Sequence, residues 1–171
     1  IDPYSSLVRL LKGLRDCRDN EVEVRVLAIN NFLNEYGEEI NPAYKAIFHY
    51  NIRRSKLETF FTMVADLDNV TDEIKTVWLT QLANFLLADL NSRQDLSDVD
   101  NVWCIKTLLR NLEATPELDV VICRLTDNSF NLSELEDVYE CYPKLFDVML
   151  SEEVFQAKKI LGLATSDLIA L

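Results

Sequence analysis

The side chain used most often in acid–base catalysis occurs once in this chain of 171 residues, as His49. A Ser-His-Asp or Cys-His catalytic site would have to use it, because the chain has no second imidazole. His49 lies within residues 47–51, in a segment whose apolar spacing is helical. A helical histidine that is partly exposed or hydrogen-bonded needs no catalytic role. The chain is therefore predicted not to be an enzyme.

Carboxylates are the other abundant catalytic groups, and their spacing does not favour a metal or glycosidase site. Glu136 and Glu140 fall on one helical face, but a di-iron helical bundle uses a Glu-x-x-His pair. The residue three positions before His49 is Ala46. Residues 95–101 carry several Asp side chains and lack the central glycine of a calcium-binding EF-hand loop. No metal site is predicted.

The four cysteines, Cys17, Cys104, Cys123 and Cys141, are 87, 19 and 18 positions apart. Zinc sites need Cys and His at short spacing, and three isolated glycines cannot form a phosphate-binding loop. We therefore expect no cofactor. Scattered cysteines in a glycine-poor helical chain favour buried free thiols in a reducing compartment. The predicted location is intracellular, either cytoplasmic or nuclear.

The net charge of −12 is unevenly distributed along the chain. Residues 1–60 contain nine acidic and nine basic side chains, whereas residues 61–171 contain twenty acidic and eight basic ones. The surplus of negative charge disfavours non-specific binding to nucleic acid or anionic lipid. The longest uncharged stretch, residues 76–88, is too short to span a bilayer. The expected partner is another protein or a peptide, with no membrane contact.

Two clusters of side chains have the composition of protein-binding surfaces. A basic cluster near the end of residues 1–60, the part of the chain without net charge, could bind carboxylates or phosphates through paired guanidinium hydrogen bonds. An acidic and aromatic cluster within residues 134–146 suits a basic peptide, because aromatic rings supply contact area and carboxylates steer the approach. The first cluster consists of His49, Arg53, Arg54 and Lys56, and the second of Glu136, Tyr139, Glu140, Tyr142 and Phe146.

The apolar residues recur at steps of three and four, which predicts an all-α fold of seven to nine antiparallel helices. Gly37 is expected to cap the end of the second helix. Ser97, with Asp100 three positions later, is expected to cap the start of a later one. Whether residues 42–67 form one helix or two is open. Helix starts are predicted near Pro3, Val22, Asn41-Pro42, Thr71, Ser97, Thr115-Pro116, Ser133 and Ser151.

The widest apolar faces lie in the middle of the chain, and both tryptophans are predicted to pack in the core there. The face in residues 71–90 comprises Ile74, Val77, Trp78, Leu82, Phe85, Leu86 and Leu90. The face in residues 97–112 comprises Val99, Val102, Trp103, Ile105, Leu108, Leu109 and Leu112.

Residues 19–28, Asp-Asn-Glu-Val-Glu-Val-Arg-Val-Leu-Ala, resemble the second helix of a HEAT-type repeat. The resemblance implies an array of helical pairs, here expected at about 3–36, 42–66, 71–112 and 116–149. A compact helical bundle fits the same pattern. In either case residues 1–171 are expected to form one α-helical domain of a larger intracellular protein.

Two functions follow from these architectures. An array of helical pairs would be a non-enzymatic scaffold that binds another protein within an intracellular assembly, the role that the HEAT resemblance implies. A compact bundle would be a regulator of the cell-death or viral immune-modulator type, which binds an amphipathic partner helix in an apolar groove.

Overall fold

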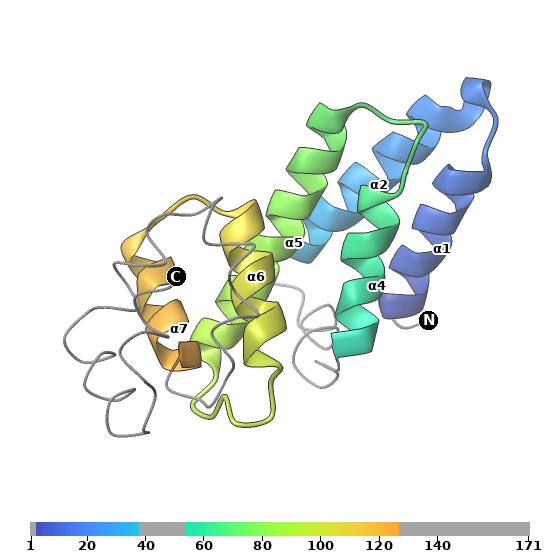
Figure 1. Cartoon of the computed structure of the whole chain (residues 1–171). Coiled ribbons are helices and arrows are strands. Elements are labelled where there is room, and N and C mark those ends of the chain that lie inside the picture. The colour runs from blue at the N-terminus through green and yellow to red at the C-terminus, as the bar shows by residue number, and fades with distance from the viewer. Residues whose placement is uncertain (1–2, 38–53, 127–171) are drawn as a thin grey trace. The chain divides into compact units, whose positions relative to one another are not determined.

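Every regular element in the described part of the protein is a helix, as predicted (Figure 1). The structure is a computed structural model that describes residues 3–37 and 54–126. The chain divides into two compact units, residues 1–89 and 90–171. The helices are α1 (Pro3–Asp16), the short 3₁₀ helix η1 (Asp19–Glu21), α2 (Val22–Gly37), α4 (Arg54–Ala65), α5 (Asp72–Ser92), α6 (Asn101–Asn111) and α7 (Pro116–Thr126).

Helix boundaries follow local capping chemistry. The Thr71 hydroxyl oxygen accepts a hydrogen bond from the backbone N–H of Ile74 at 3.3 Å, where α5 begins. Thr115 accepts one from Leu118 at 3.2 Å, with Pro116 as the first residue of α7. These contacts occupy backbone donors that have no partner inside the helix. Both predicted starts are confirmed. Helix α2 extends to Gly37, the last described residue of that segment, and the predicted cap there stays a prediction.

The predicted cap of α6 is wrong by one turn. Asp100, not Ser97, is the N-cap, and its carboxylate accepts a hydrogen bond from the Trp103 N–H at 3.0 Å. The backbone N–H of Ser97 instead donates to the Asp95 carboxylate at 2.9 Å. Residues 95–97 thus form an Asx-type turn, in which a side chain replaces the helical backbone acceptor.

In residues 1–89, α1 packs against both α2 and α4. Helix α2 lies beside α5, as three side-chain pairs show. The Trp78 indole N–H donates to the Asn30 side-chain oxygen at 2.7 Å, and the Gln81 amide to that of Asn34 at 3.3 Å. The Tyr36 and Phe85 rings lie 4.4 Å apart between centroids. Because the residue numbers rise together, the two helices run parallel.

The turn after α1 and the turn after α4 are joined directly. The Asn69 side-chain amide donates to the Leu14 carbonyl oxygen at 2.7 Å and lies 3.8 Å from the Cys17 sulfur. The turns that follow α1 and α4 therefore lie at one end of this unit. The interior is filled by large apolar side chains, among them Leu7, Leu11, Leu14, Ile29, Leu33, Phe60, Val64, Trp78, Leu82 and Leu86.

In residues 90–126, α6 packs against α7. Arg124 of α7 reaches the end of α5, where its guanidinium donates to the carbonyl oxygens of Leu90, Arg93 and Gln94 at 3.2, 2.5 and 3.4 Å. A cation suits this position, because the last carbonyl groups of a helix lack partners and carry partial negative charge. The core includes Cys104, Ile105, Leu108, Leu118, Val121, Ile122 and Leu125.

The core prediction is confirmed for Trp78 and Trp103, which are 0% and 9% exposed. Val77, which the spacing places on the same apolar face as Trp78, is 55% exposed. Cys17, Cys104 and Cys123 are free thiols as expected, although only Cys104 is buried. The predicted starts at Asn41-Pro42, Ser133 and Ser151 lie outside the described residues, as does Cys141.

Candidate functional site

Most of the predicted binding residues lie outside the described part of the chain. This applies to His49 and Arg53 of the basic cluster. It applies also to the whole acidic and aromatic cluster, namely Glu136, Tyr139, Glu140, Tyr142 and Phe146. Arg54 and Lys56 lie in the first turn of α4. Both clusters stay predictions.

The described residues contain a different candidate, an open groove of about 760 Å³ formed by α1, the turn after it and the start of α2. We call it the basic groove. Helix α1 presents one face to it along most of its length, and Arg25 of α2 closes the opposite side. Its lining residues are Ser5, Val8, Arg9, Lys12, Gly13, Asp16, Cys17, Arg18, Asn20, Glu21 and Arg25.

Four cationic side chains line the groove against two anionic ones, Asp16 and Glu21. Both anions have cationic partners. Asp16 accepts two hydrogen bonds from Arg15, at 2.8 and 3.0 Å, and Glu21 lies 3.5 Å from the Arg25 guanidinium. The Arg15 hydrogen bonds, with the charges of Arg15 and Lys12, hold the pKa of Asp16 below its ordinary value. Asp16 therefore stays ionised at neutral pH.

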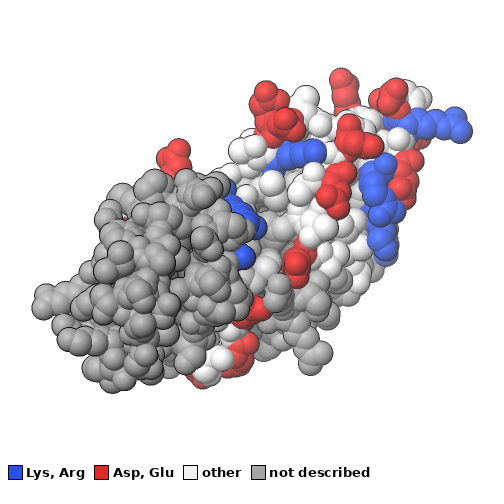
Figure 2. Space-filling model, viewed as in Figure 1, with Lys and Arg blue, Asp and Glu red and all other residues white. Residues whose placement is uncertain are grey.

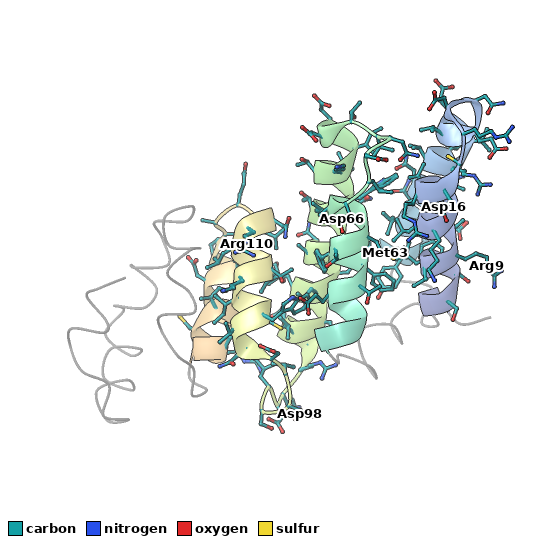
Figure 3. All side chains as sticks on the ribbon, turned by 45° about the vertical axis from the view of Figure 1, so that its right-hand side comes forward. Arg9, Asp16, Met63, Asp66, Asp98 and Arg110 are labelled. Atoms are coloured by element: carbon teal, nitrogen blue, oxygen red, sulfur yellow. The ribbon has the colours of Figure 1, made fainter. Side chains whose placement is uncertain are left out.

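The other cations have no such partner. Within residues 3–37 and 54–126, the side chains of Arg9, Lys12 and Arg18 form no hydrogen bond or ion pair. Figure 2 shows Lys and Arg side chains along the right-hand edge of the molecule, where α1 and its following turn lie. In Figure 3, Arg9 extends from α1 away from the neighbouring helices. These side chains can form charge-assisted hydrogen bonds with oxyanions.

A glycine in α1 shapes the wall of the groove. A Cβ atom at Gly13 would overlap Nη1 of Arg25, so the guanidinium lies directly over the glycine backbone. The Nε atom of Arg25 is buried without a hydrogen-bond partner, and the ion pair between Arg25 and Glu21 is long at 3.5 Å. Arg25 therefore lies close to α1 and keeps guanidinium donors that Glu21 does not occupy.

Arg25 also borders a second groove of about 440 Å³, on the other side of the same residues. The two grooves share Asn20, Glu21 and Arg25. The second groove is more apolar, since Leu10, Val24 and Ala28 complete its lining. Val24 is 71% exposed, and Leu27, one turn further along α2, is 59% exposed. A charged groove and an apolar surface thus adjoin on one helical pair.

The cations of the basic groove are not among the binding residues predicted from the sequence. Arg9 and Lys12 are three positions apart, which places them on the side of α1 away from Leu7, Leu11 and Leu14. That spacing could have indicated a basic helix face. Arg18 and Arg25 belong to the turn and to α2, and only the packing of α2 on α1 brings them to the same groove.

Among the described residues, no group of three or more His, Cys, Asp or Glu side chains could hold a metal ion. No helix in residues 3–37 and 54–126 is long and apolar enough to cross a membrane. No protein-family model, curated protein or solved structure matches the chain.

Proposed function

We propose that this chain is a non-enzymatic interaction module, which binds another protein through the first helical pair. The observation that carries the proposal is the basic groove. It is large enough for a segment of a partner, and it is lined by Arg9, Lys12 and Arg18, whose side chains make no ion pair with described residues. Exposed cations that form no ion pair with the described residues are available to an external partner.

The proposal includes an array of seven to nine helices, stacked as HEAT-like pairs. Its support is the arrangement of residues 1–89, where α2 and α5 run parallel and the turns after α1 and α4 lie together. Stacked repeats of a helical pair place successive second helices side by side in this way. As part of a larger intracellular protein, such an array would act as a scaffold.

The compact-bundle alternative has its own observation, the second groove, in which Leu10, Val24 and Ala28 lie beside Asn20, Glu21 and Arg25. An amphipathic partner helix would place its apolar face there. This groove is smaller, at about 440 Å³. We therefore favour the basic groove as the docking surface.

Affinity capture from an extract of the source cells tests the proposal, with three forms of the chain as bait. The first is the natural chain, and the second is the groove variant R9Q/K12Q/R18Q. The third is a control, K75Q/K106Q/R110Q, which removes three positive charges from other helices, so both variants have a net charge of −15 instead of −12.

A protein that the natural chain and the control retain, and the groove variant loses, is the expected result. If all three baits capture the same proteins equally well, the groove is not the docking surface. Far-UV circular dichroism of the three baits verifies that each is folded.

A further inference from the structure

We propose that the occupant of the basic groove is an extended segment rich in Asp and Glu from a partner protein. The inference rests on the proposed function and specifies the chemistry of the partner. It is carried by three properties of the groove, namely its length, the spacing of its cations and the surface that Val8 and Arg25 form between them.

The length of the groove suits a short stretch of extended chain. The residues of α1 that line it run from Ser5 to Asp16, which is about 17 Å at 1.5 Å per residue. An extended peptide rises about 3.3 Å per residue, so about five residues fit along α1. A partner helix would fill the same length with about eleven residues and would be roughly 10 Å wide.

The cations are distributed along the groove and do not converge on one point. Arg9 and Lys12 are one helical turn apart on α1, and Arg18 lies beyond the end of that helix. Alternate side chains of an extended peptide point to the same side, about 7 Å apart. Two or three carboxylates of such a peptide would therefore each meet a different cation, whereas a single phosphate would reach only one or two.

The surface between the cations accommodates a peptide backbone. Val8 supplies an apolar contact, and the planar Arg25 guanidinium covers Gly13, so a peptide there would lie against Arg25. The Arg25 side chain is 42% exposed and lies 3.5 Å from Glu21, so its terminal N–H groups offer further donors beside Gly13. Peptide carboxylates would gain charge-assisted hydrogen bonds there.

Charge balance favours an acidic peptide over nucleic acid. Four cations and two anions line the groove, a surplus of two positive charges. A short acidic segment matches this number. A nucleic-acid strand has a phosphate at every nucleotide and would extend past the groove over a protein whose net charge is −12.

Fluorescence anisotropy with fluorescein-labelled hexaglutamate and the full chain tests the inference. We expect the natural chain to bind this probe, and to bind it more weakly as salt rises from about 50 to 200 mM. Removing three ion pairs in R9Q/K12Q/R18Q should weaken binding by about tenfold or more. The control K75Q/K106Q/R110Q should stay within about twofold, because it retains the groove.

A second readout locates the bound peptide. Cys17 lines the groove and Cys123 does not, and both thiols are partly exposed. Hexaglutamate should slow alkylation of Cys17 at least about threefold, measured by peptide mass spectrometry, with no change at Cys123, because a bound peptide covers only the groove thiol. Equal protection of both thiols, or of neither, contradicts binding in the groove.

Three other results would overturn the inference. They are an absence of hexaglutamate binding by the natural chain, an equal loss of binding in both variants, and tighter binding of hexathymidylate than of hexaglutamate. Its failure is separable from that of the proposed function. If a captured partner still depends on Arg9, Lys12 and Arg18 while hexaglutamate does not bind, the docking surface stands and only the acidic chemistry is wrong.

Discussion

Replacing Asn30 by Ala tests whether α2 and α5 are held together as the structure describes. The Asn30 side-chain oxygen accepts a hydrogen bond of 2.7 Å from the indole N–H of Trp78, which is 0% exposed. In Asn30→Ala the indole N–H would lose its partner inside the protein. A buried donor without an acceptor costs about 1–3 kcal/mol, more than the net value of an average hydrogen bond.

The expected result is a fall of about 1–3 kcal/mol in the free energy of unfolding, measured by urea denaturation with far-UV circular dichroism. Asn31→Ala is the matched control, because Asn31 is the next residue of α2 and is exposed. The control should change stability by less than about 0.5 kcal/mol. Both substitutions raise helix propensity by a similar amount, so their difference isolates the contact with Trp78.

A double-mutant cycle with Trp78→Phe makes the test specific. Phenylalanine has no indole N–H, so Asn30→Ala should cost little once Trp78 has been replaced. We expect a coupling energy of about 1 kcal/mol or more between the two positions. If Asn30→Ala costs the same in both backgrounds, or no more than Asn31→Ala, the contact between α2 and α5 is wrong.

Three further predictions concern Gly13, Arg124 and Tyr36. Gly13→Ala should raise the free energy of unfolding by up to about 1 kcal/mol, since alanine favours helix and the flexible Arg25 side chain can move aside; a fall would show that Arg25 cannot move. Arg124→Ala should lower it by about 2–3 kcal/mol, because the carbonyl oxygens of Leu90, Arg93 and Gln94 lose a charged donor. Arg124→Lys should restore part of the loss, and Arg9→Ala, at an exposed position with no ion pair to the described residues, should cost less than about 0.5 kcal/mol. Burial, and secondarily the Asp89 carboxylate, raise the pKa of Tyr36. Neutral Tyr36 therefore stabilises the fold fully below about pH 10, the ordinary tyrosine value, and this contribution is lost as pH rises further. Tyr36→Phe should flatten the decline in unfolding free energy above about pH 10; an unchanged slope would contradict the burial of the phenol.

The local features of the fold were predictable because they depend on residues a few positions apart. The starts of α5 and α7 follow from Thr71 and from Thr115 with Pro116, whose caps bond to backbone groups three residues later. The buried positions of α7 follow from apolar spacing at three and four. The start of α6 was harder to predict, since Ser97 and Asp100 are both good caps. The Asx turn at Asp95 engages the Ser97 N–H and leaves Asp100 as the cap.

Helix pairing and the basic groove depended on the tertiary structure. Asn30 and Trp78 are 48 positions apart, and no local rule selects one buried donor for one distant acceptor. Val77 belongs to an apolar stripe, yet it is 55% exposed, because the stripe of α5 is wider than the surface its neighbours cover. The groove cations come from α1, the turn and α2. By itself, the sequence determined that this chain forms helices and where most of the described ones begin. Only packing decided which faces meet and which charges are left for a partner, because these depend on contacts between distant segments.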